Sequence, residues 1–219
     1  MTIEGFTAAS REFFTRDALE LAPDLLGCHL AHTTDDGTVG LIITEMEAYT
    51  GERDPGSHAF RGKTARNSTM FGEAGHLYAY FTYGMHYAIN VVAGEVGHPY
   101  GCLVRAGRVI EGADLARRRR TKPARVSALP DRDLARGPGN LAQALGANLG
   151  NDGDDLIGGR WQLLVPDVKP ADISTGPRVG VSGPGGDGDT FPWRYWITDD
   201  PTVSAYKPGA VRVRDSPLA

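Results

Sequence analysis

The chain has 219 residues with a formal net charge of −4, and 41% of its residues are hydrophobic. This length and composition are typical of a globular protein with a sizeable core, so we expect one domain over residues 1–219. The sequence has no apolar run near the roughly 20 residues that a membrane helix needs, and its first residues lack a secretory pattern. We therefore exclude a membrane partner and expect a cytoplasmic protein.

The cysteines give no support to a metal site. Neither Cys28 nor Cys102 lies in a CxxC pair, so a zinc cluster is not expected. The two are able to form one disulfide, but free buried thiols are the favoured interpretation in a cytoplasmic protein. No other zinc, magnesium or calcium spacing is present, so we expect no metal and no cofactor.

The charges are segregated along the chain, which matters more for a nucleic-acid partner than their sum does. Residues 105–136 hold ten Lys or Arg and four acidic residues, a net charge of +6. Residues 151–200 hold nine acidic and four basic residues, a net charge of −5. The total of −4 alone argues against nucleic acid, whereas the basic segment is suited to a phosphate backbone.

Hydrophobic periodicity indicates an α+β fold with several antiparallel strands. An apolar stripe predicts a helix over residues 9–26, capped by Ser10 or Thr15 and interrupted at Pro23. The other expected elements are strands over 27–31 and 39–49, a polar loop over 50–68, a strand pair over 77–90, a strand over 102–106, helices over 111–120 and from 136–140 through 147, strands over 161–165, 178–182 and 194–198, a loop over 183–189 and a poorly ordered tail after 208.

The strand over 39–49 carries carboxylates within an otherwise apolar run. Side chains two residues apart share a strand face, so Glu45, Glu47 and Tyr49 lie together. A carboxylate in an apolar strand is costly unless it is paired or takes part in chemistry. A metal-dependent nuclease using Glu45, Glu47 and Asp54 is conceivable, but no matching His or acid cluster supports it.

The strand pair over 77–90 is unusually rich in tyrosine. We expect some of its members, such as Phe81 and Ile89, to pack in the core. Tyrosine needs a hydrogen-bond partner when buried, and a pocket for a planar base uses both the ring face and the hydroxyl. The turn carries Tyr83, and an exposed aromatic at a hairpin tip is suited to wedging between stacked bases.

These residues, in this order, resemble the alkyladenine (3-methyladenine) DNA glycosylase family, whose members excise alkylated purines, and we interpret the chain as a bacterial member. The resemblance covers most of the chain and implies a compact domain around a curved antiparallel sheet, flanked by helices, with a protruding β-hairpin. The motifs that carry it are Glu47-Ala48-Tyr49, His58, Arg66-Asn67, Met70-Phe71, Tyr78-Ala79-Tyr80, Tyr83-Gly84-Met85, Asn90, Arg105-Ala106, Arg136-Gly137-Pro138-Gly139-Asn140-Leu141, Gln143-Ala144-Leu145 and Arg178-Val179-Gly180-Val181.

The resemblance assigns a role to each matching residue. It implies that Glu47 activates a water that attacks the sugar, with Arg105 near that water. It implies a pocket for an extruded base and a wedge that fills the vacated stack. The pocket residues are Tyr49, His58, Tyr80 and Asn90, of which Asn90 discriminates against guanine, and the intercalating residues are Tyr83 and Met85.

Several residues are candidates for the DNA backbone, each with a plainer alternative. The basic residues of the loop over 50–68 contact phosphate or form a solvated loop. Arginines at the end of the helix over 111–120 also suit its C-terminal dipole. Glycines before the next helix free backbone N–H groups for a phosphate or simply form a tight turn. The candidates are Arg61, Lys63, Arg66, Arg117, Arg118, Gly137 and Gly139.

The expected function is therefore monofunctional base excision, acting as a monomer on double-stranded DNA with damaged purines and associated with the nucleoid through DNA. The expected lesions are 3-methyladenine and 7-methylguanine, with hypoxanthine or ethenoadenine. None of the four lysines falls at an active-site position of the family, so no Schiff-base step is expected. The main alternative is a non-catalytic nucleic-acid-binding module of similar fold. A helix-hairpin-helix glycosylase, suggested by Gly137-Pro138-Gly139, requires a more helical chain.

Overall fold

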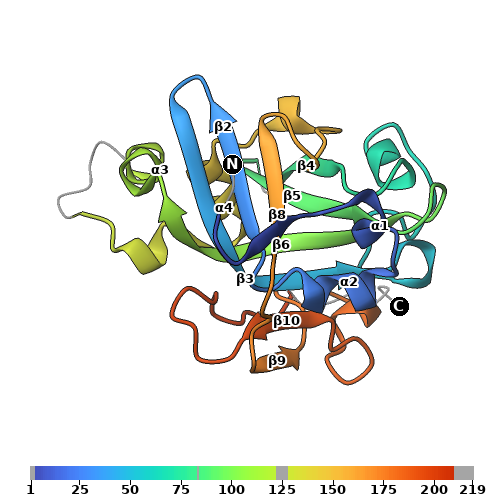
Figure 1. Ribbon diagram of the computed structural model, residues 1–219. Coiled ribbons are helices and arrows are strands. Elements are labelled where there is room, and N and C mark those ends of the chain that lie inside the picture. The colour runs from blue at the N-terminus through green and yellow to red at the C-terminus, as the bar shows by residue number, and fades with distance from the viewer. Residues whose placement is uncertain (1–2, 83, 122–127, 210–219) are drawn as a thin grey trace, which may run out of the picture.

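A curved antiparallel sheet organises the protein (Figure 1). The computed structural model describes residues 3–82, 84–121 and 128–209. The main strand order is β1-β8-β2-β3-β6-β5-β4, with β10 joining β3, β9 joining β10 and β7 joining β6. The strands are β1 (Phe6–Ala8), β2 (His29–Thr34), β3 (Gly37–Tyr49), β4 (Leu77–Thr82), β5 (His86–Ala93), β6 (Tyr100–Glu111), β7 (Ala135–Arg136), β8 (Trp161–Pro166), β9 (Ile173–Gly176) and β10 (Arg194–Ile197).

Strand β3 is shared by two parts of the sheet. It pairs with β6 along one edge, while its other edge pairs first with β2 and then with β10. Its pairing with β6 shifts register three times, around Gly40, between Ile43 and Glu45, and between Glu45 and Met46. Register shifts of this kind bend a strand and change the aim of its side chains. Two of these shifts adjoin Glu45, in the half of β3 that pairs with β10.

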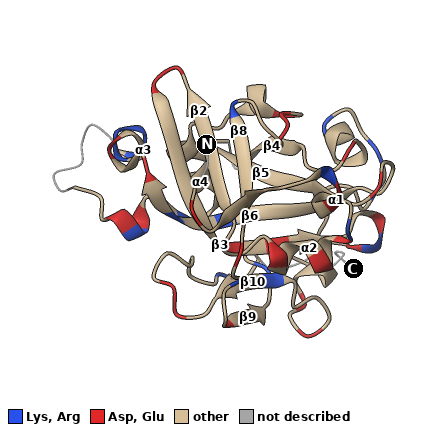
Figure 2. Cartoon of the chain, in the orientation of Figure 1, with Lys and Arg blue, Asp and Glu red and all other residues tan. Residues whose placement is uncertain are grey.

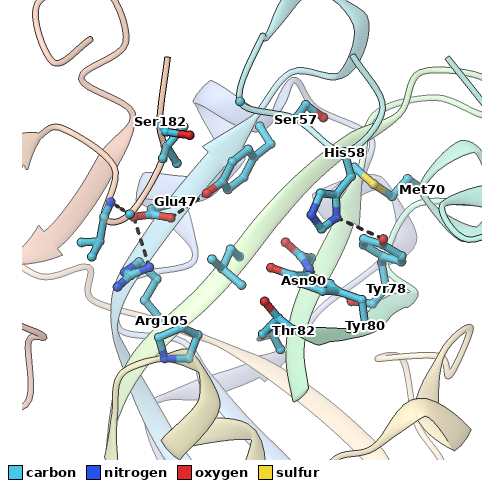
Figure 3. Close-up of a pocket in the computed structure, with 18 of the residues that line it drawn as sticks. Glu47, Ser57, His58, Met70, Tyr78, Tyr80, Thr82, Asn90, Arg105 and Ser182 are labelled. Carbon is cyan, nitrogen blue, oxygen red and sulfur yellow. Dashed lines mark hydrogen bonds and ion pairs between the residues drawn. The ribbon is translucent and has the colours of Figure 1, made fainter. Parts of the chain in front are cut away.

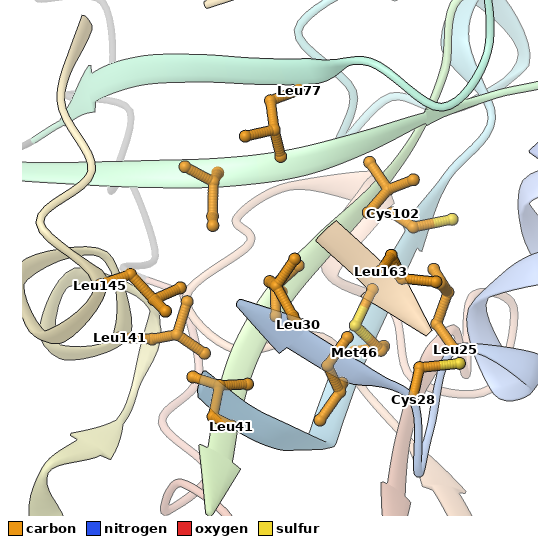
Figure 4. Packing of buried hydrophobic residues seen from close by; sticks show 14 of the residues in the cluster. Leu25, Cys28, Leu30, Leu41, Met46, Leu77, Cys102, Leu141, Leu145 and Leu163 are labelled. Atoms are coloured by element: carbon orange, nitrogen blue, oxygen red, sulfur yellow. The ribbon is translucent and has the colours of Figure 1, made fainter. Parts of the chain in front are cut away.

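The core lies inside the curl of the sheet. Leu77 from β4 and Leu163 from β8 belong to one buried cluster, although these strands lie near opposite ends of the strand order. Figure 4 shows them together with residues of β2, β3 and β6. The amphipathic helix α4 adds Leu141 and Leu145 to the same cluster. Closing the curl in this way buries apolar side chains from both ends of the sheet, which is the main stabilising contribution.

Short helices cover the sheet and differ from the single helix expected over residues 9–26. That segment forms α1 (Arg11–Phe14) and α2 (Ala18–Asp24), so the expectation of one helix was wrong. The side chain of Asp17 interrupts the segment because it accepts a hydrogen bond from the N–H of Leu19 and caps α2. Ser10 precedes α1 without a capping hydrogen bond. The other helices are α3 (Ala113–Arg120), α4 (Pro138–Leu145) and the 3-10 turns η1 (Gly51–Arg53), η2 (Ser68–Phe71), η3 (Asp131–Asp133), η4 (Leu149–Asn151) and η5 (Pro184–Gly186).

The α+β class and most of the predicted strands are confirmed. The strand expected over 178–182 was wrong, because that segment is a loop. The short strands β1, β7 and β9 were not anticipated. Phe81 was also expected in the core, but it is exposed, whereas Ile89 is buried as expected. The tail expected to be poorly ordered lies outside the described residues from 210 onward.

The two cysteines agree with the interpretation of free buried thiols. Cys28 and Cys102 are both free and buried. Within the three described ranges, no helix is long and apolar enough to cross a bilayer. Lys and Arg gather on α3, and acidic residues lie around α2 (Figure 2).

We expect the stability of the fold to depend on pH through His29 and His32. Both are buried, and burial lowers the pKa of each below the ordinary value of 6.5. Well above pH 6.5 the unfolded and folded forms are both largely neutral at these sites. Below it the unfolded chain takes up protons that the folded chain resists. The free energy of unfolding is therefore expected to fall as pH drops from about 7 to 5.

His29 provides the specific test, because neither of its ring nitrogens has a hydrogen-bond partner among the described residues. In His29→Leu, the decrease in unfolding free energy between pH 7 and 5 should be smaller than in the wild type. Denaturant titrations at several pH values measure both slopes. Equal slopes for the two proteins would remove His29 from this pH dependence.

Candidate functional site

A cavity of about 330 Å³ opens beside the acidic half of β3. Its walls come from β3, β4, β5 and β6, from the loops around residues 55–58 and 179–182, and from the start of α4. Figure 3 shows Glu47 and Arg105 on one side and His58, Tyr78 and Tyr80 on the other. The lining residues are Glu47, Tyr49, Pro55, Gly56, Ser57, His58, Met70, Tyr78, Tyr80, Thr82, Ala88, Asn90, Leu103, Arg105, Pro138, Val179, Gly180, Val181 and Ser182.

Glu47 is a fully buried carboxylate held by three donors. Its Oε1 accepts a hydrogen bond from the backbone N–H of Val179 at 2.6 Å and lies 3.3 Å from Nη1 of Arg105. Its Oε2 accepts one from the hydroxyl of Tyr49 at 2.8 Å. Burial and the negative charge of Glu47 raise the pKa of Tyr49 well above its usual value, so the hydroxyl remains a donor. These contacts fix the carboxylate at the cavity wall.

Arg105 lies between two buried carboxylates. Its Nε donates to Oε1 of Glu45 at 2.8 Å, and its Nη1 faces Glu47. Burial alone disfavours the cation, but the charges of Glu47 and Glu45 more than offset this and raise the pKa of Arg105. A second arginine, Arg194, donates from Nε to Glu45 at 2.7 Å. Two cations therefore compensate two anions on the same face of β3.

A second buried ion pair holds the loop that contacts Glu47. Arg178 and Asp54 are both fully buried, and two guanidinium N–H groups bind the two carboxylate oxygens at 2.5 and 2.7 Å. Burial opposes the charge of Arg178, but the hydrogen bonds to Asp54 raise its pKa overall. The guanidinium also lies over the ring of Tyr49, 4.5 Å from its centroid. Arg178 thus packs against the ring of Tyr49. Because Val179 is the next residue, the ion pair also holds the backbone N–H that Val179 donates to Glu47.

The opposite wall is aromatic. The ring of His58 meets that of Tyr80 edge-on at 4.6 Å, and Tyr78 stacks beside Tyr80 at 5.4 Å. Nδ1 of His58 lies 3.2 Å from the hydroxyl of Tyr78. Partial burial of the ring and the nearby charge of Arg66 lower the pKa of His58. The wall is therefore uncharged at pH 7, apart from the cation of Arg66 near its rim.

Asn90 lines the same cavity from β5, opposite Tyr78 in the strand pairing. It is 5% exposed, and its Nδ2 donates to the backbone carbonyl of Tyr78 at 3.2 Å. This bond ties the amide to the edge of β4 and fixes its orientation toward the cavity. A polar side chain held in this way restricts which groups fit against it.

The structure brings together all the residues expected at the catalytic and base-binding positions, since they all line the cavity. Met85 does not, because it lies at the tip of the β4–β5 hairpin with 69% of its surface exposed. Tyr83 lies outside the described residues. Arg66 is near the aromatic wall, where its guanidinium lies 5.9 Å from the centroid of Tyr80. Arg61 and Lys63 are exposed on the same loop, and neither lines the cavity.

Most arginines of α3 make ion pairs or hydrogen bonds within the protein. Arg117 pairs with Asp114 and Asp131, and Arg119 donates to the backbone carbonyl of Ala144 at the end of α4. Arg118 is exposed. Contact of Arg117 or Arg118 with DNA stays a prediction, and these internal bonds explain at least part of the basic run.

Different local constraints explain the glycines on either side of Pro138. Gly137 has φ +92°, a conformation that favours glycine before a helix. A Cβ on Gly139 would approach the His86 ring to 2.9 Å, so the hairpin packs closely on the start of α4. Close packing accounts for Gly139 without a phosphate.

Sequence reasoning missed several residues that build the site. Asp54 was considered only as a metal ligand, and no ion-pair partner was predicted for Glu45, whereas they pair with Arg178 and Arg105. Ser57 and Ser182 line the cavity without having been anticipated. No local pattern identifies these partners, because the chain separates Asp54 from Arg178 by 124 residues.

The chain matches the methylpurine-DNA glycosylase (MPG) family over residues 12–201. It therefore belongs to this family, and it is a DNA glycosylase. The expectation drawn from the ordered motifs is confirmed.

Bacterial relatives agree with this assignment. A protein of Leifsonia xyli subsp. xyli is 54% identical over 198 residues, which cover 90% of this chain and 92% of the relative. A protein of Streptomyces avermitilis is 51% identical over 212 residues, covering 95% and 96%. One from Corynebacterium efficiens is 44% identical over 191 residues, covering 87% and 93%. All three bear the name "Putative 3-methyladenine DNA glycosylase".

The buried pair Asp54–Arg178 is expected to be a major contributor to stability. Asp54→Asn leaves the Arg178 cation buried without a counter-charge, which typically costs about 3–5 kcal/mol of unfolding free energy. The matched control is Asp35→Asn, which removes a salt bridge whose partners are 91% and 65% exposed and should cost less than about 1 kcal/mol. Denaturant unfolding of both variants measures the difference. Similar small losses would show that the buried pair is dispensable.

Proposed function

We propose that this glycosylase hydrolyses the bond between a damaged purine and its sugar with a water activated by Glu47. The observation that carries the proposal is the position of the Glu47 carboxylate. It is buried, it is oriented by Val179, Tyr49 and Arg105, and it lines an aromatic cavity. A carboxylate so fixed is preorganised for one reaction geometry.

The cavity is suited to an extruded purine. Enzymes that act on a base take it out of the stack and hold it between aromatic side chains. Tyr80 and His58 offer ring surfaces on one side, and Tyr49 lies on the side of Glu47. We expect the base between these walls, with its glycosidic bond toward Glu47. Asn90, held by the carbonyl of Tyr78, would then meet the purine edge and disfavour the exocyclic amine of guanine.

The chemistry follows from charge. As the glycosidic bond lengthens, the sugar gains oxocarbenium character, which a nearby carboxylate stabilises. Glu47 accepts a proton from water as that water attacks C1′. Arg105 compensates the negative charge of Glu47. Because Glu45 shares this cation, Arg105 contacts only Oε1 of Glu47, and Oε2 can still accept a hydrogen bond from water. Among the described lysines none lines the cavity, so the proposal involves hydrolysis without a Schiff base.

The proposed substrates are 3-methyladenine and 7-methylguanine in duplex DNA, with hypoxanthine or ethenoadenine as neutral substrates, and the proposed acting form is a monomer. Cationic alkylpurines are already good leaving groups, so the carboxylate and the pocket suffice for them. A non-catalytic binding module would have no need for a carboxylate buried with three donors, because burying the charge is costly. The site therefore favours the enzyme over the binding module.

The central test is Glu47→Gln. The amide keeps the size of the side chain but removes the base and the negative charge, so single-turnover release of 3-methyladenine should fall by at least about 100-fold. Affinity for lesion DNA should stay within several-fold of wild type. Glu52→Gln, an exposed neighbour on η1, is the control and should remain fully active. Wild-type release by Glu47→Gln would exclude the proposed role.

The hairpin tip gives a separate test. Met85 is 69% exposed, so its side chain contributes little to the folded core, and we expect it to stabilise the extruded state by filling space in the stack. Met85→Ala should lower base flipping, followed by 2-aminopurine fluorescence, by about three- to tenfold without changing the melting temperature.

Val168→Ala provides the matched control, because Val168 is 83% exposed on a different part of the surface. It should leave both flipping and melting temperature unchanged. An unaltered flipping signal in Met85→Ala would remove Met85 from the intercalating role.

A further inference from the structure

Glu45 is the second carboxylate of β3, and it does not line the cavity. It is fully buried and has four donors. Its Oε1 accepts from Nε of Arg105 at 2.8 Å and from Nε of Arg194 at 2.7 Å. The other two donors belong to one residue, Ser204, whose hydroxyl reaches Oε1 at 2.9 Å and whose backbone N–H reaches Oε2 at 2.7 Å.

Ser204 also contacts Arg105 directly. Nη2 of Arg105 donates to the Ser204 hydroxyl at 3.2 Å, and Nη2 of Arg194 donates to the Ser204 carbonyl at 2.7 Å. The adjacent carbonyl of Val203 accepts from Nε of Arg136 at 2.9 Å. The segment around Ser204 is therefore held in place by three arginines and Glu45, although it contains no regular helix or strand. It lies beyond residues 12–201, over which the chain matches its family.

The N–H groups of the Arg105 guanidinium are divided between the Glu45–Ser204 pair and Glu47. Nε and Nη2 are occupied by Glu45 and Ser204, and Nη1 is left facing Glu47. An arginine next to a carboxylate otherwise tends to form a bidentate pair that uses both oxygens. Such a pair would displace the Tyr49 or Val179 donor and occupy the oxygen that Glu47 needs for water.

We infer that Glu45 and Ser204 are positioning residues that hold Arg105 in its single-N–H contact with Glu47, so that the short segment around Ser204 is a working part of the active site. The inference rests on the proposed roles of Glu47 and Arg105. It goes further because neither positioning residue touches the cavity, and because it extends the site past the residues matched to the family.

The Ser204 hydroxyl provides the sharpest test, because Ser204→Ala removes one oxygen and keeps the backbone N–H that binds Glu45. The single-turnover rate of 3-methyladenine release should fall about tenfold, since a small misplacement of a catalytic group is costly. Affinity for lesion DNA should not change, and the melting temperature should fall only modestly, because one hydroxyl with two hydrogen bonds is lost. Ser204→Thr keeps the hydroxyl and should restore most of the rate.

Ser174→Ala is the matched control. The Ser174 hydroxyl bonds that of Thr198 at 2.8 Å, so this variant also removes one serine hydroxyl contact from the C-terminal third, but away from Arg105. It should release the base at the wild-type rate. All rates are measured well below the lowest melting temperature of the set, so that folding does not limit them.

Three outcomes overturn the inference: wild-type release by Ser204→Ala, equal slowing by Ser204→Ala and Ser204→Thr, or equal slowing by Ser174→Ala. Arg105→Gln is measured in parallel. Wild-type release by Arg105→Gln defeats the proposed role of Arg105 itself, whereas a slow Arg105→Gln beside a fast Ser204→Ala defeats only the positioning inference.

Discussion

The site depends on the compensation of carboxylates that β3 carries into the interior. Glu45 and Glu47 are both fully buried, and isolated charges in such surroundings are strongly disfavoured. Arg105 and Arg194 supply two cations, and neutral N–H and O–H donors supply the remaining contacts. The result is a cluster with no net charge, in which each carboxylate oxygen has a fixed set of donors. A catalytic carboxylate is tolerated here because a second, non-catalytic one shares its counter-ions.

This requirement explains why the C-terminal third wraps around β3. Strand β10 pairs with β3 beside the acids and brings Arg194 to Glu45. The loop after β9 brings Arg178 to Asp54 and the N–H of Val179 to Glu47, across 132 residues of sequence. The site is therefore completed only when the last part of the chain has docked. Contacts of such separation are slow to form, so we expect the site to assemble late in folding.

The sequence was informative wherever the signal was local. The two-residue period of β3 places Glu45, Glu47 and Tyr49 on one face, and their shared contacts with Arg105 and with one another agree with this. The ordered motifs also predicted which residues meet at the cavity. The partners of buried charges could not be predicted, because nothing in the sequence around Asp54 indicates that it pairs with Arg178. The segment over 178–182 has a strand-like composition, yet its polar contacts with Glu47 and Asp54 hold it as a loop. Phe81 likewise looked apolar enough for the core, but on β4 it lies on the exposed face of the hairpin.

The two buried cysteines have a consequence for a protein that works where DNA is being alkylated. Electrophiles that methylate purines also attack thiolates, and the thiolate is the reactive form of cysteine. Burial raises the pKa of Cys28 to about 12 and raises that of Cys102 as well. Both sulfur atoms are thus protonated and shielded from solvent at neutral pH, and these are the only cysteines in the sequence. The fold keeps its softest nucleophiles away from the reagents whose damage its family repairs.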